Sequence, residues 1–433
     1  MQEITFRLIK MSKRKIRIID VTNRDGVQTS RIGLAKLEKT IINMELDKMG
    51  VWQSEFGFPV TRHERNYLNA NLELVEMGII RRIRLSGWIR AIKDDVIKAF
   101  EKVPDIKYAN MSISTSKQMI KGKFRGKMGW EDIIENMTSA VKTGQDLGLS
   151  AIGVNAEDAS RTSLPKLLRF ASAARDAGAD RLRYCDTLGF DDPFSIYERV
   201  GTIARETGMD IELHCHNDLG MAVACTVAGS KAAVDAGVNA YMNTTINGIG
   251  ERTGNADLAS CILAIKKSSG FKDNYKLDSR IDLKRIWKLA NYASRCFEIP
   301  IPISQVAIGE NAFAHESGIH VDGALKDHRN YELYNHDEVG RGHVEEIETG
   351  RQITTGEYSG IKGFKNMTGR YKIRFKSDEE ARDILEAVRY ANVHTQKPVT
   401  EDEIMFIAKY PNQAKKIMTV IPWDGVTVPE MMR

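Results

Sequence analysis

Residues 151–186 read AIGVNAEDASRTSLPKLLRFASAARDAGADRLRYCD, and this stretch decides the fold. It begins with a short apolar run, Ala151–Asn155, of the kind that forms a buried strand. A longer segment, Leu164–Ala177, repeats apolar residues at i, i+3, i+4 and i+7, which is the spacing of an amphipathic helix. Gly178 is placed to end this helix, and a second apolar run, Leu182–Asp186, follows it. The stretch therefore predicts a strand, a covering helix and a second strand.

The same unit recurs along the first part of the chain. The strand-like runs are Ile16–Val21, Val51–Phe56, Arg81–Ser86, Tyr108–Ile113, Ala151–Asn155, Leu182–Asp186, Ile211–His214 and Ala240–Thr245. Helical patterns lie between them, including Leu34–Met49, Trp130–Leu147 and Pro193–Thr207, and several end in a glycine just before the next strand. Eight strand–helix units of this kind predict an α/β fold, a (β/α)₈ TIM barrel over residues 16–270.

Outside these residues the alternation is absent. Residues 1–15 are basic and are predicted to form a solvated N-terminal extension, and residues 271–433 are predicted to form smaller, mainly helical subdomains. Helices are expected over Leu283–Phe297, Glu310–Leu325 and Ser377 to about Lys416, with a turn-like segment at Lys272–Arg280 and an irregular one at Asn335–Phe364.

Composition narrows the class of protein. The 63 basic and 58 acidic residues give a net charge of +5, too mild to indicate nucleic-acid binding but suited to an anionic substrate. The five cysteines follow no paired or zinc-finger spacing, which favours a reducing compartment. No apolar run approaches the length of a membrane span, and the N-terminus lacks the apolar stretch of a signal peptide. We therefore expect a cytoplasmic protein that binds neither membranes nor nucleic acid.

Polar side chains follow several predicted strands at their carboxyl ends, where barrels of this class carry their active sites. Asp25 follows the first strand, His214 and His216 end the seventh, and Asn255 follows the eighth. The first, seventh and eighth strands are neighbours in a closed barrel. Two imidazoles on one strand face, with oxygen donors nearby, suit a borderline divalent metal with open coordination positions. Open positions indicate a catalytic metal site rather than a structural one.

Simpler structural roles stay open for these residues. Asp25 could brace the turn before Gly26, and the two histidines could make ordinary hydrogen bonds. Glu251 and Arg252 are expected to form an ion pair that shapes the Gly-rich loop after the eighth strand. Cys215, between the histidines, is expected to point to the opposite strand face and pack in the core.

Four motifs resemble the synthase branch of the metal-dependent acyl-CoA lyase and synthase superfamily. They are Asp20–Gln28, His214–Asp218, Gly248–Asn255 and His315–Gly323. This branch includes the 2-isopropylmalate, citramalate and homocitrate synthases and the Re-type citrate synthases, and the chain looks most like the last of these. Residues 16 to about 365 carry the resemblance.

The resemblance implies a role for each matching residue. Asp25, His214, His216 and Asn255 look like metal ligands or near-ligands, for Mn²⁺ first and Co²⁺, Mg²⁺ or Zn²⁺ as alternatives. The residues that match catalytic positions are Arg24, as a cation that stabilises negative charge, Glu157, as an acid, and His320, as a base supplied by the second subunit of a domain-swapped homodimer. Arg161, Thr187 and Gln28 look like substrate-binding residues, and Arg90, after the third strand, is a further candidate for binding a carboxylate.

The implied reaction is the condensation of acetyl-CoA with a 2-oxo acid, followed by hydrolysis of the thioester. Oxaloacetate is the first choice of oxo acid, 2-oxoglutarate the second, and the substrates of isopropylmalate and citramalate synthases are further alternatives. Departures from the family pattern occur at Asn23, Val27, Trp88 and Gln352–Gly360, and His343 stands about where relatives carry a tyrosine.

Three rival functions remain at this point. A lyase or aldolase of the same superfamily is the closest. A metal-dependent hydrolase is disfavoured because such barrels carry His-X-His on the first strand, whereas here it lies on the seventh. A non-catalytic metal-binding protein would bind the ion without releasing CoA.

Overall fold

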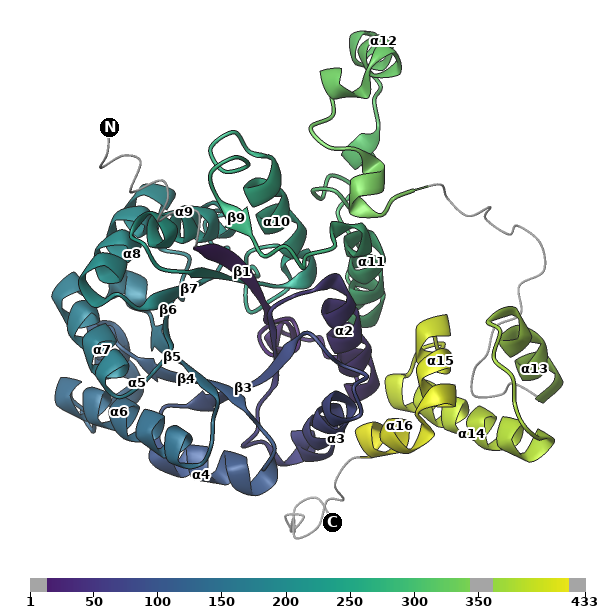
Figure 1. Cartoon of the computed structure of the whole chain (residues 1–433), viewed down its shortest axis with the longest axis horizontal. Coiled ribbons are helices and arrows are strands. Elements are labelled where there is room, and N and C mark those ends of the chain that lie inside the picture. Colours follow the sequence, from purple (N-terminus) through teal and green to yellow (C-terminus); the bar gives the residue numbers. More distant parts are fainter. Residues whose placement is uncertain (1–13, 343–360, 420–433) are drawn as a thin grey trace, which may run out of the picture.

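The structure is a computed structural model that describes residues 14–342 and 361–419, and its centre is a closed barrel of eight parallel strands (Figure 1). The strands are β1 (Lys15–Asp20), β2 (Gln53–Gly57), β3 (Arg84–Arg90), β4 (Tyr108–Ser114), β5 (Ala151–Glu157), β6 (Arg181–Asp186), β7 (Asp210–Cys215) and β8 (Ala240–Thr244). Each strand pairs with the next, and β1 pairs with both β8 and β2, which closes the barrel. The predicted TIM barrel, with its further helical region, is confirmed.

Helices surround the barrel because each has one apolar stripe to bury against the strands. They are α2 (Lys36–Met49), α3 (Arg65–Glu76), α4 (Lys93–Lys102), α5 (Lys117–Phe124), α6 (Trp130–Asp146), α7 (Leu164–Asp176), α8 (Pro193–Thr207), α9 (Ala222–Asp235) and α10 (Leu258–Lys267). Glycines end several of them, as predicted. Gly50 after α2 has φ +83°, and a Cβ there would lie 2.0 Å from the carbonyl oxygen of Arg280, so only glycine fits.

The predicted bounds of the third strand are wrong by several residues. The strand runs from Arg84 to Arg90, whereas the sequence pattern predicted Arg81–Ser86. The Asp47 carboxylate accepts the backbone N–H groups of Arg81 (3.1 Å) and Ile83 (2.8 Å). This side-chain cap holds the residues before Arg84 in a turn, so their backbone cannot join the sheet.

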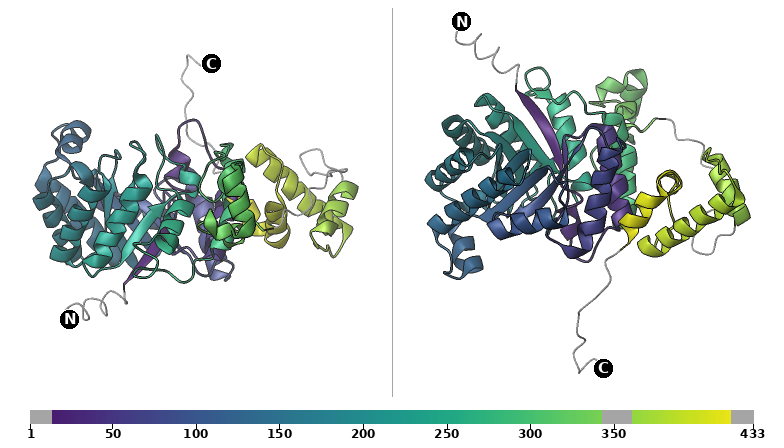
Figure 2. Two further views of the ribbon diagram at one scale, coloured as in Figure 1. Left: turned by 90° about the horizontal axis from the view of Figure 1, so that it is seen from above. Right: turned by 60° about the horizontal axis from the view of Figure 1, so that its bottom comes forward.

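The residues after the barrel form a mainly helical region, as predicted. Its helices are α11 (Ile286–Phe297), α12 (Gly318–Lys326), α13 (Ile361–Arg370), α14 (Asp378–Thr395), α15 (Glu401–Lys409) and α16 (Pro411–Met418). α11, α15 and α16 contact α2 on the outside of the barrel, while α12 stands away from it (Figures 1 and 2). No helix among the described residues combines the length and apolar character that crossing a bilayer requires.

Two expectations for this region need correction. The single helix predicted over Glu310–Leu325 is a short 3-10 turn, Glu310–Phe313, and then α12, because Ser317 has extended backbone angles and Gly318 and Gly323 weaken the helix. The turn-like segment before α11 also contributes a two-residue strand, β9 (Lys276–Leu277), beside β1. His343 and the departures at 352–360 lie outside the described residues, as do residues 1–13 of the predicted basic extension.

Candidate active site

A cavity of about 260 Å³ opens at the carboxyl ends of the strands. It is lined by side chains from seven of the eight strands or the loops that follow them: Arg24, Asp25, Gln28, Trp88, Ser112, Asn155, Glu157, Arg183, Cys185, Thr187, His214, His216, Glu251 and Arg252. Seven residues predicted for the site therefore meet here: Arg24, Asp25, Gln28, Glu157, Thr187, His214 and His216. They come from opposite ends of the barrel sequence and meet because the barrel closes.

Asp25, His214 and His216 form a buried cluster at one side of this cavity. One ligand atom from each lies within 4.8 Å of the others, and His216 Nε2 is 3.9 Å from Asp25 Oδ2. The two imidazole rings stand edge to face with their centroids 5.0 Å apart, because both project from the same face at the end of β7. Cys215 between them is buried in the hydrophobic core, as expected.

The protonation states of this cluster suit metal binding. Burial lowers the pKa of His214 well below its ordinary value, and burial likewise lowers the pKa of His216. Both imidazoles are therefore neutral at physiological pH and carry a free lone pair. Burial alone would raise the pKa of Asp25, but the Arg24 guanidinium together with the other polar groups of the cluster outweighs it, and the pKa lies below its usual range. The cluster offers two neutral nitrogens and one carboxylate.

The cluster also leaves polar atoms without protein partners. His214 Nδ1, His216 Nδ1 and Asn255 Oδ1 are buried, and no hydrogen bond to them occurs among the described residues. Buried polar atoms of this kind are costly unless a ligand or ion satisfies them. Gly250 packs against Asn255 so closely that a Cβ there would lie 1.8 Å from Asn255 Oδ1 and 3.4 Å from Asp25 Oδ2. The residues present thus fit a divalent metal ion.

The alternative role for Asp25, bracing the turn that follows it, finds no support. Asp25 stands at the N-cap of the 3-10 turn Gly26–Gln28, but its side chain makes no capping hydrogen bond. Its Oδ1 instead accepts a hydrogen bond of 2.6 Å from Arg24 Nη1. The carboxylate therefore faces the cavity rather than its own turn.

Arg24 is held in place by two carboxylates. Its Nη1 binds Asp25, and its Nε donates to Glu55 Oε2 at 2.8 Å; both pairs are buried. Gln28 lies at the edge of hydrogen-bond range, 3.5 Å from Nη1. The planar guanidinium uses its fork to bridge two partners while one edge stays on the cavity, and a lysine cannot reproduce this geometry.

We expect Arg24→Lys to lower kcat by at least about 10²-fold, as loss of a preorganised donor to a developing oxyanion does. The fold should survive because the positive charge beside Glu55 and Asp25 is kept. Steady-state rates, with thermal unfolding measured beside them, check this result. A variant with near-wild-type kcat would show that Arg24 has only a structural role.

A layer of buried charge below the cavity was not predicted from the sequence. Arg183 Nε donates to Glu212 Oε1 (2.6 Å), its Nη2 donates to Glu55, and Arg181 Nε donates to Glu212 Oε2 (2.7 Å). Burial alone would lower the pKa of Arg183, but the carboxylates of Glu212 and Glu55 outweigh it and raise the pKa. Because Glu55 also holds Arg24, this layer connects the floor of the cavity to its catalytic candidate.

Glu157 lies at the end of β5 and lines the cavity. Its carboxylate accepts hydrogen bonds from Ser114 and from Lys123 Nζ (2.7 Å) on α5. Its side chain is 26% exposed, so it is open to solvent from the mouth of the barrel. Lys123 is a further residue beside the site that was not singled out from the sequence.

The loops after β5 and β6 interlock beside Glu157. Asp158 adopts a left-handed conformation (φ +63°), and its backbone N–H donates to Thr187 Oγ1 at 2.9 Å. Arg161 is turned back onto the Asp158 carboxylate, with an Nη2–Oδ2 distance of 2.6 Å, and does not line the cavity. Thr187 and Arg161 therefore both contact Asp158, Thr187 at its backbone N–H and Arg161 at its carboxylate.

The ion pair expected between Glu251 and Arg252 is not the one observed. Arg252 Nε binds Asp218 Oδ1 at 2.9 Å and its Nη2 donates to the Thr187 carbonyl oxygen. These two contacts place the guanidinium between the loop after β6 and the loop after β7. Arg252 itself has a left-handed backbone (φ +56°).

The structure does not bring two further candidates to the cavity. Arg90 is paired with Asp95, at an Nε–Oδ2 distance of 2.5 Å, and its side chain is 63% exposed. His320 lies on α12, is exposed, and stacks on Tyr331 with ring centroids 4.2 Å apart. His315, on the same segment, is bound to Glu332 at 3.2 Å. Within one subunit, His320 therefore takes no part in the cavity.

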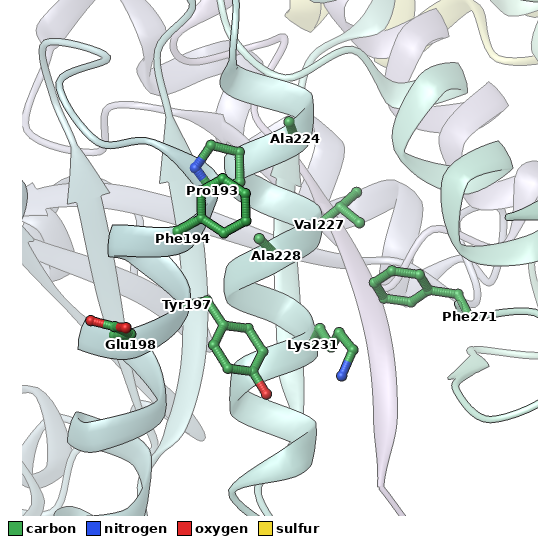
Figure 3. Close-up of a pocket in the computed structure, with 9 residues that line it drawn as sticks. All are labelled: Pro193, Phe194, Tyr197, Glu198, Ala224, Val227, Ala228, Lys231 and Phe271. Atoms are coloured by element: carbon green, nitrogen blue, oxygen red, sulfur yellow. The ribbon is translucent and has the colours of Figure 1, made fainter. Parts of the chain in front are cut away.

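A second hollow, about 460 Å³ in volume, lies on the outer wall of the barrel between α8 and α9 (Figure 3). Its lining is mostly apolar and includes Phe194, Tyr197, Val227 and Phe271. The one lysine there, Lys231, is neutralised by Asp235 at 2.7 Å. It contains none of the predicted site residues and no convergent set of polar groups, so the smaller cavity at the barrel mouth is the better candidate for the active site.

Comparisons with known proteins identify the family of this chain. The chain matches the HMGL-like family over residues 15–292 and the homocitrate synthase post-HMGL domain-like family over residues 307–396. It is 56% identical to a citrate (Re)-synthase from Dehalococcoides mccartyi strain CBDB1, over 94% of this chain and 99% of that protein. It is 38% identical to 2-isopropylmalate synthase 2 from Caldanaerobacter subterraneus subsp. tengcongensis, over 90% of this chain and 94% of that protein.

Among solved structures, an HMG-CoA lyase from Acinetobacter baumannii has a TM-score of 0.56 and 16% identity, over 70% of this chain and 98% of that one. At this identity the likeness shows the barrel fold alone. The family match and the relatives above 30% identity confirm the resemblance found in the motifs. The chain belongs to the HMGL-like family of enzymes, in the branch of the 2-oxo acid synthases.

Proposed function

We propose that this protein condenses acetyl-CoA with oxaloacetate and hydrolyses the resulting thioester to release citrate and CoA. The observation that carries the proposal is the cavity itself, where three guanidinium groups, of Arg24, Arg183 and Arg252, surround the buried Asp25–His214–His216 cluster. The 56% identical citrate (Re)-synthase supports the choice of product. Lyase or aldolase chemistry is less favoured, because the match extends through the homocitrate synthase domain at residues 307–396.

We propose that Asp25, His214, His216 and Asn255 hold a divalent metal, with Mn²⁺ first and Co²⁺, Mg²⁺ or Zn²⁺ as alternatives, since neutral imidazoles and oxygen donors suit borderline ions. Such an ion, when bound, supplies Lewis acidity at the keto oxygen and a template for the oxo acid. Arg24 keeps a fixed positive charge beside that oxygen as the new bond forms.

Two proton transfers and one hydrolysis complete the reaction. A base removes a proton from the acetyl methyl group, the methyl carbon attacks the keto carbon, and the keto oxygen becomes a hydroxyl. Water then cleaves the thioester, so the acyl group becomes a carboxylate and CoA leaves as the thiol. We assign the base to His320 of a second subunit, since histidine is the most frequent general base in enzymes. We assign Glu157, held by Ser114 and Lys123, as the acid.

The proposal also covers the domains, the oligomeric state and the cellular compartment. We propose that residues 16–270 form the catalytic domain and that residues 271–433 take part in a domain-swapped homodimer. Within one subunit His320 is exposed and does not line the cavity, which supports its use in trans. All five cysteines are buried and unpaired, which supports a reducing, cytoplasmic compartment.

Arg183 favours an oxo acid with a second carboxylate over one with an aliphatic tail. It lines the cavity, is fully buried, and its Nη1 has no hydrogen-bond partner among the described residues. Its other nitrogens are fixed on Glu55 and Glu212, so Nη1 cannot turn away. A distal carboxylate would satisfy this donor, whereas a methyl or isopropyl group would leave it buried and unpaired at a cost. We assign Arg183 to the distal carboxylate.

Arg183→Lys should raise KM for oxaloacetate by at least about tenfold and leave KM for pyruvate nearly unchanged, because pyruvate lacks the second carboxylate. The lysine keeps the charge that Glu55 and Glu212 require, which protects the fold. Initial rates with both oxo acids, together with the melting temperature, make the comparison. An equal loss with oxaloacetate and pyruvate would mean that Arg183 acts only by holding Glu55.

The overall proposal is tested by release of CoA thiol from acetyl-CoA with oxaloacetate, 2-oxoglutarate, pyruvate and 2-oxoisovalerate in turn. We expect the highest kcat/KM with oxaloacetate. A preference for 2-oxoglutarate would make the protein a homocitrate synthase instead, and a preference for pyruvate or 2-oxoisovalerate would point to citramalate or isopropylmalate synthesis. Release with none of the four would overturn the assignment to a synthase.

A further inference from the structure

The cavity at the barrel mouth is too small to hold a whole CoA thioester. Its volume of about 260 Å³ falls below the usual size of pockets for drug-sized ligands. It has room for the oxo acid and the acetyl group. The pantetheine arm must therefore leave through the mouth, and the adenosine phosphates must lie on the outer rim of the barrel.

One segment of that rim carries an unusual density of positive charge. Between Lys117 and Lys127 there are five basic residues and no acidic one: Lys117, Lys121, Lys123, Arg125 and Lys127. All five are exposed. Ile120 and Phe124, on the other side of α5, pack against the hydrophobic core, so the helix is anchored with its cations turned outward. We call these five residues the α5 basic patch.

The α5 basic patch lies beside the cavity. α5 follows directly on β4, and Ser116 caps its first turn by accepting the N–H of Met119 at 3.1 Å. Lys123 reaches from α5 to Glu157, which lines the cavity, and to Ser114, at the end of β4, at 3.2 Å. The patch is thus fixed to the rim within one side chain of the proposed catalytic acid.

The other four cations of the patch lack a counter-charge. In the part of the chain that the structure describes, no carboxylate lies within ion-pair distance of Lys117, Lys121, Arg125 or Lys127. Lys117 and Lys121 are also spaced i, i+4 on one helix face, where like charges repel and destabilise the helix. An anionic ligand bound across the patch would remove this repulsion.

Three other arginines around the mouth are already neutralised. Arg90 is paired with Asp95, Arg161 with Asp158, and Arg252 with Asp218. A multiply charged anion that approaches this part of the mouth therefore meets a concentrated group of unpaired cations at α5. Lysine and arginine side chains are the usual partners of phosphate oxygens.

We propose that the α5 basic patch binds the phosphate groups of the CoA nucleotide while the thioester occupies the cavity. This inference rests on the proposed function, since it takes the thioester to be the co-substrate. The pantetheine arm then runs from α5 past Glu157 toward the Asp25–His214–His216 cluster. Lys123 has a second contact in Glu157, so the phosphate contacts fall mainly to its four unpaired neighbours.

The test is a triple variant, Lys121→Gln, Arg125→Gln and Lys127→Gln, which leaves Lys123 and Glu157 intact. KM for acetyl-CoA should rise by at least about tenfold, since electrostatic attraction of a charged ligand is lost. KM for S-acetylpantetheine, which lacks the nucleotide phosphates, should stay within about twofold on the same argument. Added salt should weaken acetyl-CoA binding in the wild type and much less in the variant.

A matched control removes three positive charges from the opposite end of the barrel: Lys107→Gln, Lys272→Gln and Lys276→Gln. These residues are exposed, Lys107 directly precedes β4, and Lys276 pairs with the first residue of β1. The control should keep the wild-type KM for both thioesters. An equal rise in KM in control and test variants would show a net-charge effect and overturn the proposal, as would an equal rise for acetyl-CoA and S-acetylpantetheine.

Calorimetric titration of the protein with free CoA and with pantetheine measures binding without turnover. It therefore separates this inference from the proposed function. CoA should bind the wild type at least about tenfold more tightly than it binds the α5 variant. Tight binding of CoA that depends on α5, without turnover of any oxo acid, would leave the subsite standing and overturn the proposed reaction. Equal affinity of both proteins for CoA would overturn the subsite, whatever the activity.

Discussion

Thorough removal of divalent metal is expected to abolish CoA release completely, and Mn²⁺, Co²⁺ or Mg²⁺ should restore it. The proposed ligands are buried, and two neutral imidazoles and a charged carboxylate together offer the donors that a divalent ion requires. Activity should therefore follow metal occupancy, measured by elemental analysis beside the rate. Full activity in protein shown to contain no metal would contradict the proposed ligand set.

His214→Ala should lose metal affinity and activity together but should still fold. The barrel core is built from apolar residues around the strands, and His214 donates no hydrogen bond through its buried Nδ1. Far-UV circular dichroism and the melting temperature verify the fold. His63→Ala is a matched control, since His63 is exposed and outside the cluster. Wild-type metal content in His214→Ala would remove His214 from the ligand set.

Restoration of activity in mixed dimers is the second large effect that we expect. His320→Ala and His214→Ala homodimers should each be nearly inactive. After subunit exchange, one site of each heterodimer would combine an intact metal cluster with an intact His320, and the other site would have neither. Activity should therefore return to about half of the wild-type value per heterodimer, because a two-fold dimer has two equivalent sites.

Native mass spectrometry confirms that exchange has taken place before the rate is measured. Heterodimers with no more activity than their parents would show that His320 does not act across the interface. His320→Ala homodimers with wild-type turnover would exclude His320 as the base. His315 is then the next candidate, although its contact with Glu332 must first be broken.

The barrel could be predicted because its signals are local. Most of its strands and helices can be recognised from the pattern within the segment itself, and a glycine marks the end of several helices, as Gly50 and Gly178 do. The error at β3 arose from a contact that is not local. Asp47 caps Arg81 from 34 residues away, and no pattern around Arg81 indicates it.

The meeting of Asp25, His214 and His216 could also be predicted, for a topological reason. Asp25 follows β1 and His214 ends β7, and once an eight-stranded barrel closes only β8 lies between these two strands. The layer of buried charge below the cavity could be predicted only in part. Arg181 and Arg183 alternate along a strand and so point inward together, but their partners are set by closure: Arg183 meets Glu55 across 128 residues of sequence. The pairing of Arg252 with Asp218 depends on loop conformation in the same way.

The central claim is that this cavity joins an acetyl group to oxaloacetate. Its most direct test is to incubate the metal-loaded protein with [1,2-¹³C₂]acetyl-CoA and oxaloacetate, and to measure citrate and CoA by mass spectrometry. The account predicts one doubly labelled citrate for every CoA released, and no citrate from the His214→Ala protein. Release of CoA with labelled acetate but no labelled citrate would contradict it, because the protein would then hydrolyse the thioester without forming the carbon–carbon bond.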